Sequence, residues 1–191
     1  NNKLALDIYR EHGNANLVTA TNVFAHLDKV KEFLFACRTI LDTHGVIVIE
    51  NPYLIDFIEN MEFDTIYFEH TQYWAVRPII ILCDQLDLVL INAEKKDIHG
   101  GTMRYTIARK SSKHKVQPSV GEYLQKEIDN GYTSFGRYSR WSEQVNNLTD
   151  SFKSQIIKLK KHGNKIVGFG ASAKGNTLLN YTKMTTKYID Y

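Results

Sequence analysis

Hydrophobic residues in the first 110 positions predict strands that alternate with a helix. Residues 17–24 and 45–51 are short, nearly continuous apolar runs, as expected of strands that are buried on both faces. Apolar residues within 27–41 recur every three to four positions, which is the spacing of an amphipathic helix. This alternation predicts a parallel sheet. Residues 86–100 and 101–110 are two further strand-like segments around a polar turn, and we expect them to end the sheet as an antiparallel hairpin.

The pattern changes after residue 110. Residues 137–162 carry apolar side chains at helical spacing and predict one long helix. Residues 165–170 then predict a strand, and a glycine-rich loop follows at 171–177. We therefore divide the chain into an α/β region at 1–110, a linker with the long helix at 111–164, and the start of a second α/β domain at 165–191.

Composition narrows the class of protein. The 191 residues are 43% hydrophobic and 24% charged, which is ordinary for a globular protein. No run of about 18 apolar residues predicts a membrane span, and the first residues do not resemble a signal peptide. Cys37 and Cys83 form no CxxC pair, so we expect neither a disulfide framework nor a zinc site, and we expect a cytoplasmic protein.

Charge is distributed unevenly along the chain. Residues 1–110 contain 11 Lys and Arg against 15 Asp and Glu, whereas residues 111–191 contain 13 against 6. The second part is therefore the better place for an anionic ligand, either a nucleoside diphosphate or a nucleic acid. The alternative is a solvated basic helix face.

The segment YFEHTQY at 67–73 is a candidate catalytic site. It places Tyr67, Glu69 and His70 within four positions. A carboxylate next to an imidazole raises its basicity and fixes its tautomer, and a tyrosine hydroxyl can stabilise a developing oxyanion. Together they could remove a proton from the carbon next to a carbonyl group. The alternative is an aromatic loop that packs on the sheet.

Two further segments follow predicted strands. In TATNVFAHLD, Asn22 and His26 come after a strand, where open α/β sheets bind ligands, although each could be an ordinary surface residue. In GFGASAKGNT, Gly168, Gly170 and Ala173 fit the alanine variant of the dinucleotide glycine fingerprint, and Lys174 adds a positive charge. The predicted hairpin turn, HGGTMR, adds two more candidate ligand contacts or serves only as a turn.

Taken in order, TATNVFAHLD, GVIVIENPYL, FDTIYFEHTQYW, HGGTMR and GFGASAKGNTLLNY resemble the S-adenosylmethionine-dependent C-methyltransferases of nucleotide-linked keto-deoxysugars. The resemblance implies that 1–110 is the C-terminal part of a class I methyltransferase sheet, which is Rossmann-like. Residues 165–191 would begin a second Rossmann-like domain that binds the nucleotide-diphosphate sugar. The implied reaction removes a proton next to the sugar ketone and transfers a methyl group to that carbon.

The resemblance also implies roles for individual residues. His70 would be the base, assisted by Glu69 and Tyr67, with His26 in the same active site. Contacts to S-adenosylmethionine would come from Ala20, Thr21 and Asn22. Contacts to the substrate would come from Asn22, His99, Arg104, Gly170, Ser172, Lys174, Asn176 and Thr177.

Some parts of the family pattern are not found in this sequence. The zinc-binding cysteines, the glycine-rich cofactor loop and the ribose-binding acid are missing, so we expect a fragment without metal that lacks half of its cofactor site. Exposed strand edges in such a fragment would favour self-association. Neither a membrane nor a nucleic acid is expected as a partner.

Two other functions remain open at the sequence level. An NAD(P)-binding oxidoreductase-like domain could use the glycine fingerprint, with Asp190 placed to bind a ribose. A non-catalytic binding domain could instead bind nucleic acid, with the aromatic and basic residues around Arg137 and Arg140 as a surface on which bases stack.

Overall fold

The computed structural model describes residues 1–98 and 100–191, and the chain divides into two compact units. The first unit comprises Asn1–Phe57 and Thr71–Thr133, and the second comprises Ile58–His70 and Ser134–Tyr191. Each unit therefore combines two separate stretches of the chain. The chain passes from one unit to the other at three points, and the first of these lies within helix α3 (Leu54–Glu59).

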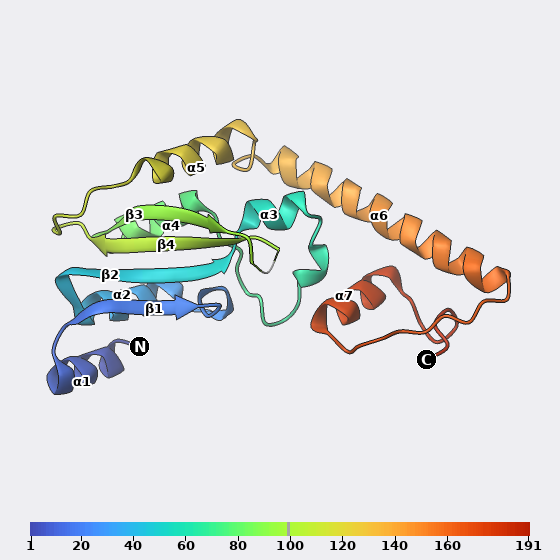
Figure 1. Cartoon of the computed structure of the whole chain (residues 1–191), viewed down its shortest axis with the longest axis horizontal. Coiled ribbons are helices and arrows are strands. Elements are labelled where there is room, and N and C mark those ends of the chain that lie inside the picture. The colour runs from blue at the N-terminus through green and yellow to red at the C-terminus, as the bar shows by residue number, and fades with distance from the viewer. Residues whose placement is uncertain (99) are drawn as a thin grey trace. The chain divides into compact units, whose positions relative to one another are not determined.

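The first unit is built on a four-stranded sheet (Figure 1). Its strands are β1 (Ala15–Thr21), β2 (Leu41–Pro52), β3 (Leu88–Lys96) and β4 (Thr102–Arg109), in the order β1-β2-β4-β3. Strands β1 and β2 are parallel, and β4 is antiparallel to both β2 and β3. The predicted parallel sheet with an antiparallel end hairpin is confirmed.

Four helices pack on this sheet or on one another. Helix α1 (Asn2–His12) contacts α2 (Val30–Ile40), which contacts β2, while α4 (Val76–Asp84) and α5 (Pro118–Asp129) both contact β3. The core consists mainly of aliphatic and aromatic side chains. Its fully buried members include Phe24, Leu34, Ile47, Ile49, Ile79, Leu88, Met103, Tyr105 and Ile107.

The helix predicted at 27–41 is shorter in the structure. It begins at Val30; residues 27–29 are not helical, and a single 3-10 turn, η1 (Phe24–His26), lies just before them. The turn follows Asn22, whose φ of 54° lies in the left-handed region that asparagine tolerates better than most residues. The chain therefore bends sharply after β1 before the helix starts.

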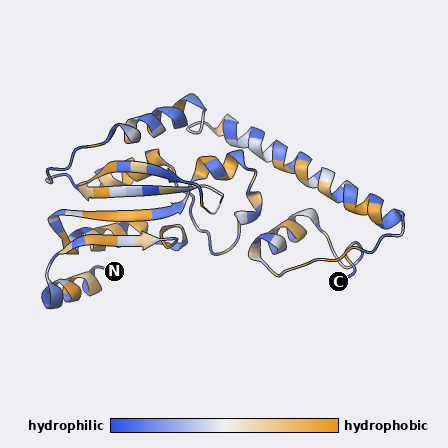
Figure 2. Cartoon of the chain, in the orientation of Figure 1, coloured by the Kyte–Doolittle hydropathy of each residue, from blue (hydrophilic) through white to orange (hydrophobic). Residues whose placement is uncertain are grey.

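The second unit contains η2 (Phe63–Thr65), α6 (Phe135–Lys161) and α7 (Ala173–Thr182). Helix α7 contacts both η2 and α6. The long helix predicted at 137–162 is confirmed by α6. Figure 2 shows hydrophobic positions recurring along α6 among hydrophilic ones, as expected of a helix that buries a narrow stripe.

The strand predicted at 165–170 is wrong. These residues, all of which the structure describes, form no strand. Only two backbone hydrogen bonds join the segment to the residues after α7, from Gly168 N to Tyr191 O and from Asp190 N to Ile166 O, each 2.8 Å long. Apolar character alone does not make a strand, because a strand also needs a continuous ladder with a neighbour.

The loop predicted at 171–177 is also largely helical. Helix α7 begins at Ala173, and Ser172 caps it by accepting a hydrogen bond from Gly175 N at 3.1 Å. Serine is a preferred N-cap because its hydroxyl oxygen satisfies an amide that has no partner within the helix.

Candidate functional site

The side chain of His70 is held by two contacts inside the second unit. Its Nδ1 lies 2.8 Å from the carbonyl oxygen of Thr65, and its Nε2 lies 3.3 Å from the hydroxyl of Tyr67. The two rings also pack, with centroids 4.3 Å apart. The 3-10 turn η2 positions this arrangement, because Thr65 is its last residue.

These contacts determine the tautomer of the imidazole. A carbonyl oxygen only accepts hydrogen bonds, so the short contact requires a proton on Nδ1 of His70. In the neutral ring the lone pair is then on Nε2, where the Tyr67 hydroxyl donates to it across 3.3 Å. That length is at the weak end for a hydrogen bond.

Glu69 lies beside this pair in sequence, and its side chain is exposed. It was predicted to orient the imidazole, but the carbonyl of Thr65 occupies Nδ1. A backbone carbonyl fixes a histidine tautomer as well as a carboxylate does, although it adds less basicity. No periodicity or motif in the sequence indicates this carbonyl, because any residue could supply it.

The carboxyl ends of β1 and β2 form a second polar group, in the first unit. Asn22 N donates to the carbonyl of Glu50 at 2.8 Å, and the Glu50 carboxylate accepts from Arg104 Nε at 2.8 Å. Glu50 is 8% exposed and pairs with Arg104 across β2 and β4. The structure thus joins Asn22 and Arg104 through Glu50, which the sequence analysis did not single out. A charged residue ending a buried apolar run was the available signal.

The neighbours of Asn22 differ in exposure. Thr21 and Asn22 have exposed side chains, whereas Ala20 is 5% exposed and packs in the core. His26 is exposed at the end of η1. Thr71, the residue after His70, donates from both its amide and its hydroxyl to the carbonyl of Ala25, at 3.1 and 3.2 Å. Within the first unit, these two bonds connect the start of the stretch 71–133 to η1.

The glycine-rich segment borders a cavity of about 530 Å³ in the second unit. Three predicted substrate residues line it, namely Gly170, Ser172 and Asn176, together with apolar side chains that include Leu178 and Ile189. Gly170 has a φ of 97°, which favours glycine. Thr177 does not line this cavity, and its hydroxyl donates to the carbonyl of Ala173 at 3.1 Å.

Lys174 borders a different cavity. Its Nζ lies 3.5 Å from Glu62 Oε2, and both residues line a cavity of about 400 Å³ together with Asp64, Phe152 and Leu178. The residues predicted to bind the nucleotide sugar at 168–177 therefore lie on two sides of the start of α7.

The hairpin segment 99–104 contains two of the predicted substrate contacts, His99 and Arg104. His99 lies outside the described residues. Gly101 has a φ of 119°, and its carbonyl accepts from Tyr53 N at 3.1 Å. Its Cα faces Asp56, which is 8% exposed and accepts from Lys95 Nζ at 2.8 Å. Gly101 therefore has a structural role, since a side chain there would collide with Asp56.

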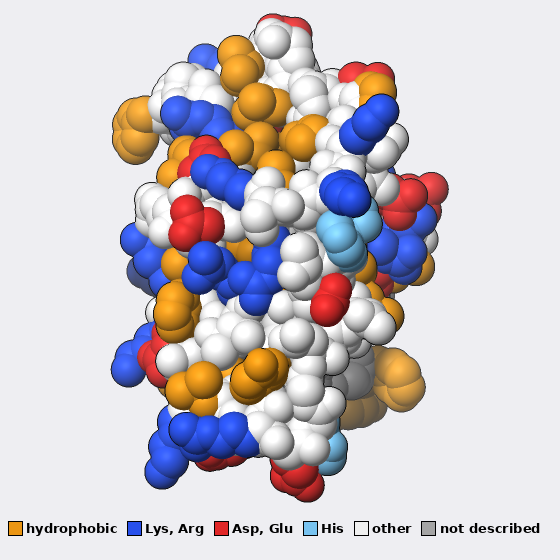
Figure 3. Space-filling view, turned by 90° about the vertical axis from the view of Figure 1, so that its left-hand side faces the viewer, with side chains coloured by type: hydrophobic (Ala, Val, Ile, Leu, Met, Phe, Trp, Pro, Cys, Tyr) orange, Lys and Arg blue, Asp and Glu red, His pale blue; other side chains and the backbone are white. Residues whose placement is uncertain are grey.

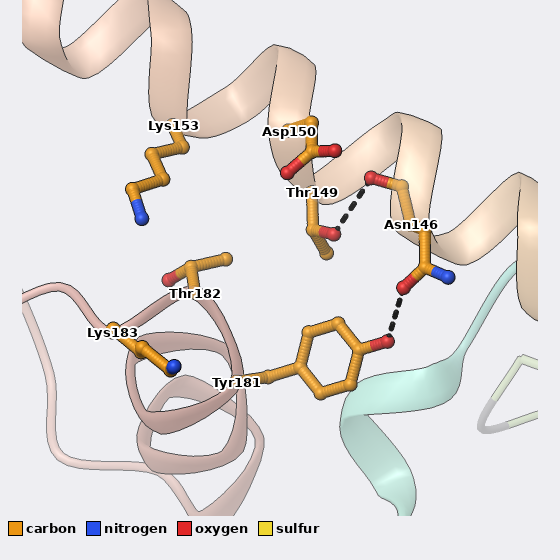
Figure 4. Close-up of a pocket in the computed structure, with 7 residues that line it drawn as sticks. All are labelled: Asn146, Thr149, Asp150, Lys153, Tyr181, Thr182 and Lys183. Carbon is orange, nitrogen blue, oxygen red and sulfur yellow. Dashed lines mark hydrogen bonds between the residues drawn. The ribbon is translucent and has the colours of Figure 1, made fainter.

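A third cavity of about 270 Å³ lies between α6 and α7, lined by Asn146, Thr149, Asp150, Lys153, Tyr181, Thr182 and Lys183. Figure 4 shows side chains of both helices facing one another there, with the Tyr181 hydroxyl donating to Asn146 Oδ1 at 2.6 Å. None of the predicted site residues belongs to it.

In the part of the chain that the structure describes, no group of three or more His, Cys, Asp or Glu side chains is arranged to hold a metal ion. No helix among the described residues is long and apolar enough to cross a membrane. On the face drawn in Figure 3, basic, acidic and hydrophobic side chains are interspersed.

The first unit is an α/β sheet with polar residues after its parallel strands, which is where open α/β sheets bind ligands. The sequence is 28% identical over 173 residues to the C-methyltransferase NovU of Streptomyces niveus, an alignment that covers 91% of this chain and 41% of NovU. Residues 97–191 match the family model described as C-methyltransferase C-terminal domain. The chain is therefore similar to C-methyltransferases, and it spans about two fifths of the length of this curated relative.

Solved structures of methyltransferases show a weaker likeness. One is the O-methyltransferase NcsB1 from neocarzinostatin biosynthesis, solved with S-adenosylmethionine and 2-hydroxy-5-methyl naphthoic acid. It is 13% identical over 50% of this chain and 29% of its own, with a TM-score of 0.42. The other is a SAM-dependent methyltransferase from Anabaena variabilis, 16% identical over 56% of this chain and 54% of its own, also with a TM-score of 0.42.

Proposed function

We propose that this chain is part of an S-adenosylmethionine-dependent enzyme that C-methylates a nucleotide-linked keto-deoxysugar. The observation that carries the proposal is the geometry of His70, whose Nε2 holds the lone pair because Nδ1 faces the carbonyl of Thr65. The match of residues 97–191 to the C-methyltransferase C-terminal domain and the similarity to NovU support transfer of a methyl group to a carbon atom. The sugar substrate follows from the motif resemblance.

His70 would act as the base in this reaction. Its Nε2 takes the proton from the carbon next to the sugar ketone, and the electrons of that C–H bond move into the enolate. Once Nε2 is protonated it no longer accepts from the Tyr67 hydroxyl. That hydroxyl can then donate to the enolate oxygen and stabilise its charge.

S-adenosylmethionine, when bound, supplies an electrophilic methyl group for this carbon. Thr21 and Asn22 fit a role in holding it, since their exposed side chains lie at the carboxyl end of the parallel strand β1. The neighbouring Asn51 supports this fit, because its buried Oδ1 has no hydrogen-bond partner among the described residues. Ala20 would contribute by packing.

The diphosphate of the substrate would bind at the glycine-rich segment. The segment that contains Gly170 leads into the N-terminus of α7, the end of a helix that favours an anion, and Lys174 adds a positive charge in the first turn. The open cavity of about 530 Å³ beside this segment is large enough for a nucleotide group.

Deuterium exchange tests the base directly and does not require the methyl donor. A nucleotide-linked keto-deoxysugar incubated with the protein in D₂O should lose its α-proton signal in the NMR spectrum. His70→Asn should slow this exchange by about 10²- to 10⁴-fold, the usual contribution of a general base. His162→Asn is the matched control, because the His162 Nδ1 also faces a backbone carbonyl, that of Lys158 at 2.7 Å.

Two results would contradict the proposal. Equal exchange rates in the wild-type protein and His70→Asn would exclude His70 as the base. If the wild-type protein binds the sugar nucleotide and catalyses no exchange, a non-catalytic binding domain becomes the better description.

The NAD(P)-binding alternative requires an acidic residue that is available to bind a ribose, and Asp190 already has other partners. Asp190, which was expected to bind a ribose, accepts from Lys160 Nζ at 2.8 Å and from Ile166 N at 2.7 Å. The Lys160 and Ile166 hydrogen bonds lower the pKa of Asp190 below its usual range. The carboxylate therefore already serves to hold the segment before the glycine-rich loop.

A further inference from the structure

An ion pair and a ring contact join α7 to the segment that carries the proposed base. Lys174 Nζ lies 3.5 Å from Glu62 Oε2, and their side chains are 48% and 21% exposed. One residue further along, the ring of Phe63 packs on that of Tyr181, with centroids 5.3 Å apart. One ion pair and one aromatic contact therefore hold η2 and the residue before it against α7.

A short series of hydrogen bonds continues from Glu62 to the imidazole. The carbonyl of Glu62, which precedes η2, accepts from the amide and the hydroxyl of Thr65, at 3.0 and 2.6 Å. The carbonyl of Thr65 accepts in turn from His70 Nδ1 at 2.8 Å. Movement of Glu62 would thus displace the group that fixes the tautomer and ring orientation of His70.

We propose that Glu62 is a positioning residue that couples ligand binding at the start of α7 to the orientation of His70. The inference rests on the proposed function, because its ligand is a nucleoside diphosphate. Lys174 carries one ammonium group, and a diphosphate at the α7 N-terminus competes with Glu62 for it. Without the diphosphate Lys174 holds Glu62; with it, Glu62 and η2 are released to adjust around His70.

The experiment combines binding with a spectroscopic signature of His70. Thymidine diphosphate is titrated into the protein at low salt, followed by calorimetry and by the ¹⁵N chemical shifts of the histidine rings. We expect the ligand to shift the His70 signals of the wild-type protein. Glu62→Gln should bind the diphosphate about two- to fivefold more tightly, because an exposed ion pair contributes little and no longer competes. Its His70 signals should already differ before ligand is added and change little afterwards.

Two variants serve as controls. Lys174→Ala should weaken diphosphate binding, and adding Glu62→Gln to it should change nothing further, because the pair is already broken. Asp64→Asn removes a negative charge from the same segment and the same cavity, and the described residues offer Asp64 no ion pair. It should retain the wild-type response of His70.

The outcomes separate this inference from the proposed function. Tight binding in which Glu62→Gln shows the same ligand-induced His70 shift as the wild-type protein overturns the coupling and leaves the diphosphate site intact. Absence of diphosphate binding to the wild-type protein overturns the proposed ligand and this coupling together. If Glu62→Gln and Asp64→Asn increased the affinity for thymidine diphosphate equally, the change in net charge alone would explain the effect, and the inference would be contradicted.

Discussion

Gly101 shows how a single residue in the hairpin is restricted by a distant neighbour. Its φ of 119° is unfavourable for other residues, and an added Cβ would collide with Asp56. We expect Gly101→Ala to lower the free energy of unfolding by about 1–3 kcal/mol, through backbone strain and the collision. Denaturant unfolding followed by circular dichroism measures the change.

Gly121 provides the matched control for this substitution. It lies inside α5, and an added Cβ would meet no atom within 4 Å. Gly121→Ala should raise the free energy of unfolding by up to about 1 kcal/mol, because alanine favours helix. Equal effects of the two substitutions would show that Asp56 does not restrict position 101. The glycine pair HGG predicted a tight turn, but no local pattern indicates that Asp56 lies behind it.

At the scale of elements, Glu127 of α5 fixes the start of α4. Its carboxylate, 2% exposed, accepts from Val76 N at 2.7 Å, Arg77 N at 3.0 Å and the Tyr53 hydroxyl at 2.9 Å. Glu127→Ala would leave these donors buried without an acceptor, and we expect it to lower the free energy of unfolding by about 2–4 kcal/mol. Glu122→Ala removes an exposed carboxylate from the same helix.

Thermal and denaturant unfolding of the two variants separates the alternatives. Glu122→Ala should remain within about 0.5 kcal/mol of the wild-type protein, as is usual for a surface substitution. If Glu127→Ala lowered the free energy of unfolding as little, the prediction would be wrong, because the amides of Val76 and Arg77 would then have another acceptor. Burial raises the pKa of the Tyr53 hydroxyl, with a further contribution from Glu127, so this hydroxyl remains a donor at neutral pH.

Elements were predictable where a hydrophobic period persisted over many residues. The strands around 17–24 and 45–51, the hairpin and the long helix all follow such periods, and the structure confirms them. The failed strand at 165–170 is also apolar, but it has no ladder of neighbours. Likewise, Tyr67 and His70 are candidates by residue type and their roles stay predictions, whereas the Thr65 carbonyl and Glu62 are indicated only by the geometry of η2. Backbone acceptors carry no sequence signal.

At the scale of the whole molecule, contacts group residues that are far apart in sequence. Ile58–His70 belongs to the same unit as Ser134–Tyr191 because η2 packs against α7. Composition changes along the chain at 110 and 164, whereas packing depends on long-range contacts that composition does not report. The segment with the proposed base therefore shares a unit with the glycine-rich helix, and the residues that follow β1 belong to the other unit.

Two buried thiols should make the first unit sensitive to alkaline pH. Burial raises the pKa of Cys37 from 9.0 to about 11 and that of Cys83 from 9.0 to about 12. Above pH 9 the unfolded chain loses these protons before the folded chain does, so the unfolded state is favoured as the pH rises. The stabilisation is complete below pH 9 and is lost through the range up to the folded pKa values.

We expect the free energy of unfolding to fall by about 1 kcal/mol per thiol between pH 8 and pH 10. Urea unfolding at fixed pH values measures this slope, to which tyrosines and lysines also contribute as they begin to titrate near pH 10. The double variant Cys37→Ala/Cys83→Ala will be less stable at pH 8 because it leaves small cavities, but its free energy of unfolding should change less up to pH 10. A slope as steep as that of the wild-type protein would assign the alkaline sensitivity to other groups, since the variant has no thiol to titrate.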